Sequence, residues 1–159
     1  MSKRQTRRKR ERGQTLAEFS LIAPILLILV FGLIDTARLF HAWVTIQHAA
    51  RECARYGVTG RTDCAAATPS RPACIEYTAR QFTDALVDTN ADLTVTTWNW
   101  QYPAYGNPST AGPGDQCDAL EVRLEYDFTP STPLIGNIFG PVHLTARERL
   151  VNEPFGPCN

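Results

Sequence analysis

The hydrophobic residues of this chain form one long run and several shorter periodic patterns, and the long run comes first, at residues 19–34. This run contains no charged residue. At about 1.5 Å per residue it spans roughly 24 Å as a helix, somewhat less than a hydrocarbon core of about 30 Å. Leu16 and Ala17 lengthen it, provided that Glu18 is accommodated. The pattern predicts one membrane-spanning helix.

The helical pattern continues beyond this run, because residues 35–56 contain neither proline nor glycine. Asp35 and Arg38 have the i,i+3 spacing of an ion pair just outside the membrane. With Gly57 as a C-terminal stop, we expect one helix over residues 14–56. Small and apolar side chains recur along its second half and predict one buried face: Ala42, Ile46, Ala49, Ala50 and Cys53.

A shorter helix and three strands follow. Ser70 and Pro72 mark the start of the helix. Residues 93–102 are rich in β-forming side chains, residues 120–128 alternate strictly between apolar and charged side chains, and residues 142–151 form the last strand. The apolar face of the short helix has four members: Ile75, Ala79, Phe82 and Leu86. The sequence therefore predicts an α+β fold with a long N-terminal transmembrane helix, a second helix and a three-stranded antiparallel sheet.

Two connections between these elements differ in character. Residues 105–115 are rich in turn-forming residues, and we expect a long connection without a strand. Residues 130–141 are apolar instead, and they predict a helical turn that covers a sheet end or a partner. The apolar side chains of this second connection are Leu134, Ile135, Ile138 and Phe139.

Charge divides the chain at Gly13. Seven of the 16 basic residues but only one of the 16 acidic residues precede it, which leaves 9 basic and 15 acidic residues afterwards, a net charge of −6. The positive-inside rule then predicts a basic cytoplasmic leader at residues 1–13, the helix with its extracytoplasmic extension at residues 14–57, and a small α+β extracytoplasmic domain at residues 58–159. The outer part has no basic patch, so we expect no nucleic acid among the partners.

Five cysteines follow the apolar run, in a compartment where disulfides would persist: Cys53, Cys64, Cys74, Cys117 and Cys158. Metal binding is the competing interpretation, but there is no C-x-x-C pair and the spacing does not resemble a zinc site. Antiparallel pairing brings the start of the strand at residues 120–128 beside the end of the last strand. We therefore expect Cys117 to pair with Cys158, Cys64 to pair with Cys74, and Cys53 to stay unpaired. Other connectivities remain open.

Residues that could carry chemistry are few. The chain has none of the common hydrolase, metalloprotease, phosphate-binding or EF-hand motifs. His41 and His48 would lie roughly 10.5 Å apart along a helix, too far for one metal ion. We therefore expect no enzyme activity, metal or cofactor. Four aromatic residues could stack on a ligand, although we expect them to pack in the core of the sheet: Trp98, Trp100, Tyr102 and Tyr105.

The start of the apolar run carries a short motif, GQTLAEF at residues 13–19, that resembles the G-x-x-x-x-E-F processing signal of prepilins. Three longer stretches, GQTLAEFSLIAPILLILVFGLIDTARLF, AARECARYGVTG and the late pair LEVRLEYDFTP and LTARERLVNEP, resemble the TadE-like family of tight-adherence pilus pseudopilins. The resemblance implies cleavage between Gly13 and Gln14 by a membrane prepilin peptidase. It also implies that Glu18 is the acidic residue recognised, followed by Phe19.

The resemblance implies a minor pilin-like structural component in assembly of a tight-adherence type pilus or a related secretion machine. Its partners would be the cytoplasmic membrane, a prepilin peptidase, other pilin-like subunits and pilus assembly proteins. The protein would cross the cytoplasmic membrane once, with its N-terminus in the cytoplasm. Whether it enters the fibre, caps it or stays in the membrane remains open.

Two alternatives assign other roles to the same residues. In the first, the chain is a signal-anchored extracytoplasmic module that binds a ligand through Trp98, Trp100 and Tyr105 and is not processed at Gly13. The second is a membrane-tethered enzyme, which would need a pocket with converging titratable groups.

Overall fold

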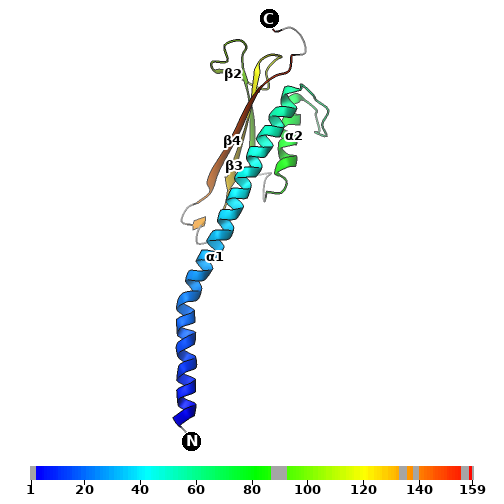
Figure 1. Ribbon diagram of the computed structural model, residues 1–159. Helices are drawn as coiled ribbons and strands as arrows, with labels where there is room; N and C mark the ends of the chain where they lie inside the picture. Colours follow the sequence, from blue (N-terminus) through cyan, green and yellow to red (C-terminus); the bar gives the residue numbers. More distant parts are fainter. Residues whose placement is uncertain (1–2, 87–92, 133–135, 138–139, 155–157, 159) are drawn as a thin grey trace.

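A single helix, α1 (Lys3–Val58), forms the long axis of the molecule in the computed structural model. Its N-terminal half stands clear of every other element, and its C-terminal half packs along the sheet (Figure 1). The helix is longer than expected, because it begins at Lys3 and ends at Val58, and it is continuous through Pro24. The structure describes the backbone of most of the chain: residues 3–86, 93–132, 136–137, 140–154 and 158.

The second helix, α2 (Arg71–Thr83), begins where the sequence indicates. The Ser70 side chain accepts a hydrogen bond from the backbone N–H of Ala73 at 3.4 Å, which satisfies one of the free donors of the first turn. Of the predicted apolar face, Ile75 and Ala79 are buried, as expected. Phe82 is 43% exposed instead, because its ring lies at the edge of the helix pair, 5.6 Å from the ring of His48.

The sheet has four antiparallel strands rather than the three that the sequence predicts. The strands are β1 (Leu93–Trp100), β2 (Pro108–Ala111), β3 (Ala119–Phe128) and β4 (Val142–Val151), in the spatial order β2-β1-β3-β4. The additional strand, β2, lies in the segment expected to be a connection without a strand. Its four residues show no apolar alternation. Pairing with the free edge of β1 defines it instead, and this pairing extends to a hydrogen bond from Gly112 N–H to the Thr97 carbonyl at 2.9 Å.

The core lies between α1, α2 and one face of the sheet. The predicted stripe of α1, from Ala42 to Cys53, is buried there against alternate residues of β3, among them Leu120, Val122 and Leu124. Small side chains allow the helix to approach the sheet closely, and the closest approach is at Gly57. An added Cβ at that position would collide with the Leu120 side chain.

A half-buried arginine joins the upper ends of these elements. Arg71 donates to the Gly57 carbonyl at 2.7 Å, to the Gly114 carbonyl at 2.7 Å and to Asn152 Oδ1 at 2.5 Å. The amide of Asn152 in turn donates to the carbonyls of Pro113 and Asp115. Burial lowers the pKa of the Arg71 guanidinium. The end of α1, the start of α2, the loop before β3 and the tail after β4 are therefore held at one point.

The apolar connection between β3 and β4 is described only in part. Gly136 N–H donates to the Thr132 carbonyl and Gly140 N–H donates to the Gly136 carbonyl, each at 2.9 Å, and this i,i+4 spacing is that of a helical turn. The side chains expected to cover a sheet end or a partner lie outside the described residues: Leu134, Ile135, Ile138 and Phe139.

Candidate functional site: the apolar helix and its junction with the domain

The apolar half of α1 is exposed along its whole length. Over residues 16–34 large hydrophobic side chains face outward on all sides, and Leu21 is 74% exposed. Within the described residues, one helix is long and apolar enough to cross a membrane, and it has a mean hydropathy of 2.5 over an 18-residue window. Those 19 residues would span about 28 Å, close to a hydrocarbon core of about 30 Å. This half of α1 therefore has the dimensions and polarity of a membrane anchor.

The residues of the GQTLAEF motif lie at the start of this exposed half. Gly13, Gln14, Glu18 and Phe19 all belong to α1, so their backbone is helical. The side-chain amide of Gln14 donates to Glu18 Oε1 at 3.2 Å, and the Phe19 ring is exposed. Glu18 thus has a hydrogen-bond partner one helical turn away. The side chains of residues 3–12 lie outside the described part of the chain.

The helix meets the lower end of the sheet at Asp35, immediately after the apolar half. Asp35 is only 5% exposed, and its two carboxylate oxygens accept hydrogen bonds from the backbone N–H groups of Ser131 and Thr132, both at 3.1 Å. Its ion pair with Arg38, at 3.6 Å, confirms the pair predicted from the i,i+3 spacing. The carboxylate is therefore shared between its own helix and the loop after β3.

Arg38 also joins α1 to the end of β3 and the loop that follows it. Its guanidinium donates to the Ser131 hydroxyl and lies over the Phe128 ring, 5.6 Å from the centroid. We call these five residues the juxtamembrane junction: Asp35, Arg38, Phe128, Ser131 and Thr132. A carboxylate that accepts two backbone hydrogen bonds, beside a cation that stacks on an aromatic ring, fixes the loop to one height along the helix.

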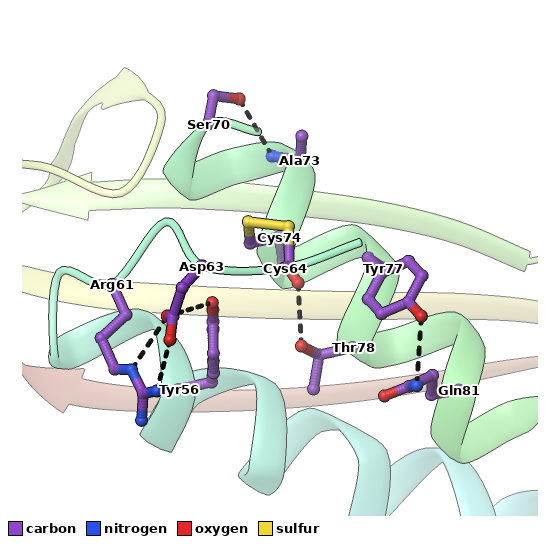
Figure 2. Close-up of a disulfide and its surroundings, with 10 residues drawn as sticks. All are labelled: Tyr56, Arg61, Asp63, Cys64, Ser70, Ala73, Cys74, Tyr77, Thr78 and Gln81. Carbon is purple, nitrogen blue, oxygen red and sulfur yellow. Dashed lines mark hydrogen bonds and ion pairs between the residues drawn. A yellow bond between two sulfur atoms is a disulfide. The ribbon is translucent and has the colours of Figure 1, made fainter. Parts of the chain in front are cut away.

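The structure brings together both cysteine pairs expected from the sequence. Cys64 and Cys74 form a disulfide with a Cα–Cα distance of 5.4 Å, and Cys117 and Cys158 form one with a Cα–Cα distance of 5.8 Å. Figure 2 shows the first of these, which ties the loop after α1 to the first turn of α2. Cys53 is the free cysteine and is fully buried; burial raises the pKa of its thiol to about 12.

A surface ion pair lies beside the first disulfide (Figure 2). Arg61 donates to both carboxylate oxygens of Asp63, at 2.9 and 2.5 Å, and the hydroxyl of Tyr56 donates to the same carboxylate at 3.4 Å. The hydrogen bond from Arg61 holds the pKa of Asp63 below its usual range. Both side chains are exposed, and the pair joins two residues of the loop between α1 and the disulfide.

The tryptophans of β1 do not pack in the core, which corrects the expectation from the sequence. The register places Val95 on the helix-covered side, opposite Leu124, so that Trp98 and Trp100 face away from both helices. Trp100 is half-buried there, since its indole N–H donates to Glu121 at 3.1 Å and the Arg149 guanidinium lies 4.3 Å from its ring centroid. Cross-strand neighbours thus shield this ring on an otherwise open face.

The two tyrosines that follow β1 belong to a separate contact. Their rings meet edge to face, 6.1 Å apart, and the hydroxyl of Tyr105 donates to the Cys117 carbonyl at 2.8 Å. Tyr102 is exposed and Tyr105 is half-buried, so neither contributes to the main core. The four aromatic residues therefore do not form one binding surface.

The helix-free face of the sheet is otherwise charged. The register places Arg149 opposite Glu121 and His143 opposite Asp127, across the antiparallel β3–β4 ladder that the sequence predicts. His143 Nδ1 lies 2.6 Å from the Asp127 carboxylate, and this hydrogen bond raises the pKa of His143.

Comparison with known protein families now bears on the exposed helix. Residues 13–55 match the family model of TadE-like proteins. The match confirms the resemblance seen in the sequence, and it links the chain to a family of structural components of the tight-adherence pilus. No curated protein and no solved structure matches the chain.

The TadE-like segment contains the motif, the exposed apolar half of α1 and the whole buried stripe from Ala42 to Cys53. Sequence reasoning identified these parts and the Asp35–Arg38 pair, but it missed Ser131 and Thr132. A Pro-Ser-Thr run at residues 130–132 signals a turn, yet nothing local reveals that its N–H groups bind a carboxylate 96 positions earlier. No group of three or more metal-ligating side chains occurs in the part of the chain that the structure describes.

Proposed function

We propose that this protein is a minor pilin-like subunit, a pseudopilin, that acts structurally in assembly of a tight-adherence pilus or a related secretion machine. The observation that carries the proposal is the position of the TadE-like match. It begins at Gly13, covers the exposed apolar half of α1, and ends within the half buried in the domain. One rigid helix would therefore join the membrane, or a bundle of similar helices, directly to a folded domain.

In this proposal the chain crosses the cytoplasmic membrane once. The basic leader, residues 1–13, would stay in the cytoplasm, residues 14–57 would form the anchor and its extension, and residues 58–159 would form the extracytoplasmic domain. The two disulfides support this orientation, because disulfides persist in oxidising compartments. Other pilin-like subunits and pilus assembly proteins would be its partners.

We further propose that a prepilin peptidase removes the leader between Gly13 and Gln14. Cleavage would delete the basic residues that hold the N-terminus in the cytoplasm and leave a free amine on Gln14. A carboxylate in the apolar part of a membrane helix costs a few kcal/mol unless it is partnered. Gln14 already lies within hydrogen-bonding distance of Glu18, so its new amine would form close to that carboxylate.

Mass spectrometry of the membrane-extracted protein tests the cut. In cells that contain a prepilin peptidase we expect the native chain to begin at Gln14, and Gly13→Ala and Glu18→Ala to retain the leader. Gly106→Ala and Glu153→Ala are matched controls, since both residues are exposed and lie far from the motif, and both should be processed. A native chain that begins at Met1 or Ser2 would refute the processing proposal.

A second candidate function is a ligand-binding or adhesion module that is anchored without processing. It is favoured by a shallow hollow of about 320 Å³ beside Trp100, whose other lining residues are Glu121, Arg147, Glu148 and Arg149. An indole beside charged side chains of both signs would suit a sugar that stacks on the ring and forms hydrogen bonds with them. Quenching of tryptophan fluorescence by such sugars, lost in Trp100→Phe, would support this candidate, and unchanged fluorescence would count against it.

A further inference from the structure

An apolar groove runs between α1 and the lower end of the sheet, on one side of the juxtamembrane junction. Its volume is about 590 Å³. The helix wall comes from the exposed apolar half of α1, and the opposite wall comes from the ends of β3 and β4. The side chains that define the two walls are Ile28, Leu29 and Gly32 on the helix and Phe128, Pro130 and Val142 on the domain.

The groove crosses the expected surface of the membrane. Taking Ile34 as the end of the apolar half, Ile28 lies about 9 Å below that level and Leu39 about 7 Å above it, from the rise per helical residue. The domain wall is held at this height because Asp35 binds the backbone of Ser131 and Thr132. The lower part of the groove is therefore continuous with the surface that faces hydrocarbon.

The two polar side chains of the groove, Asp35 and Thr36, already have hydrogen-bond partners. Asp35 already accepts two backbone hydrogen bonds and pairs with Arg38. The hydroxyl of Thr36 donates to the Gly32 carbonyl at 2.8 Å, within the helix. Among the described residues the remaining wall is apolar, so water would gain few hydrogen bonds in the groove, whereas a hydrocarbon chain would lose none.

We propose that this groove holds an acyl chain of a phospholipid from the outer leaflet of the membrane. The inference rests on the proposed membrane anchoring. Lipid is the occupant that the position of the groove favours, because its lower part is continuous with the surface that faces hydrocarbon. The bound chain covers apolar surface where the helix leaves the lipid and seats the domain on the membrane.

Photocrosslinking in nanodiscs tests the proposal on the full-length protein. One copy is placed in each disc, with phospholipids that carry a diazirine on one acyl chain, and the adducts are mapped by tryptic digestion. Lipid contact along α1 labels the peptide of residues 13–38, and lipid in the groove labels the peptide of residues 124–147. We expect both peptides to be labelled, with the domain adducts at Phe128, Pro130 or Val142.

The possible outcomes distinguish failure of the groove proposal from failure of the proposed membrane anchoring. Adducts on residues 13–38 alone would refute the groove while supporting the membrane helix, and adducts on neither peptide would refute the anchoring itself. Domain adducts that disappear when two copies share a disc would assign the groove to a second copy and overturn lipid as its occupant.

A variant that fills the groove gives an independent check. Val142→Trp should remove the domain adducts and leave those on residues 13–38 unchanged. Val151→Trp, at the exposed far end of the same strand, is the matched control and should keep both. Domain adducts that persist in a folded Val142→Trp protein would contradict the proposal. Because the native protein is mapped directly, the test does not depend on the folding of either variant.

Discussion

Glu18 is the only acidic residue between Leu16 and Ile34, and its hydrogen bond to Gln14 shows how a carboxylate is tolerated beside an apolar run. The bond joins side chains one turn apart on the same helix, so it requires no second subunit. In the proposed mature chain Gln14 would be the first residue, and its side-chain amide and its new amine would both lie near Glu18. The two motif residues would then form one local charge pair at the start of the mature helix.

Cys53 is predicted to be unreactive in the folded protein. Burial raises the pKa of its thiol to about 12, so almost no thiolate exists between pH 7 and 9, and the side chain is 0% exposed. N-ethylmaleimide should leave the native protein unlabelled and modify one cysteine after unfolding in guanidinium without reductant. Rapid labelling of the native protein would contradict both the burial and the disulfide pairing.

His143 is predicted to titrate above its ordinary pKa of about 6.5. The hydrogen bond that His143 donates to the Asp127 carboxylate favours the protonated ring, so the stabilising effect of this pair is present below the ordinary pKa and is lost as pH rises through the folded pKa. NMR titration of the labelled ring should give a raised midpoint that falls toward 6.5 in Asp127→Asn. Glu153→Gln, a distant charge change, should leave the midpoint unaltered.

At the scale of elements, two successive segments of α1 have different surroundings. Residues 16–34 are apolar on all sides and stand free, whereas the second half of the helix presents one stripe of small side chains to the sheet. The stripe allows α1 to lie close to β3, and Gly57 marks the closest point. A bulkier side chain there would push the end of the helix away from Leu120. The hydrogen bond that Arg71 donates to the Gly57 carbonyl would then lengthen or break.

Gly57→Ala is therefore predicted to destabilise the domain by about 1–3 kcal/mol, the usual cost of overpacking a filled core. The new methyl group would overlap Leu120 and press on Ile75. Urea unfolding followed by near-UV circular dichroism measures the change. Gly106→Ala is the matched control, since nothing lies within 4 Å of a Cβ at that position, and equal midpoints for both variants would contradict the prediction.

The helices and the two long strands were predictable because each carries its own periodicity. The stripe of α1 and the apolar positions of β3 are buried as their periodicity predicts, although Glu121 on the opposite face of β3 is buried as well. Strand β2 has no such pattern, since it exists through pairing with the edge of β1. The placement of Trp98 and Trp100 was wrong for a related reason: alternation shows which residues share a face, but not which face the helices cover.

At the scale of the whole molecule, the juxtamembrane junction determines how the domain sits on its helix. The core contacts hold the upper part of α1, while Asp35 and Arg38 hold the loop after β3 at the end of the apolar half. A domain attached at both levels cannot swing about the helix. In a pilus assembly, movement of the helix would therefore carry the domain with it.

Asp35→Ala is predicted to release the lower end of the domain without unfolding it. The N–H groups of Ser131 and Thr132 would lose their acceptor, so hydrogen exchange at these two amides should quicken by about ten- to a hundredfold, which corresponds to about 1–3 kcal/mol. Exchange measured in detergent by mass spectrometry checks this. Glu153→Ala should leave both amides unchanged, and slow exchange in Asp35→Ala would show that the junction holds the loop by other contacts.

The hydrogen bonding around Arg71 and Asn152 has a consequence for biosynthesis. Asn152 N–H donates to the Asp118 carbonyl, Glu153 N–H donates to the Val58 carbonyl, and Cys158 binds Cys117, so the end of α1 and the start of β3 are completed by residues that leave the ribosome about 35 to 100 positions later. The buried stripe of α1 is therefore fully covered only after β4 and the tail have been made, although α2 and β3 pack on it earlier in the chain. In the proposed orientation, the domain would complete its fold only after these last residues have crossed the membrane.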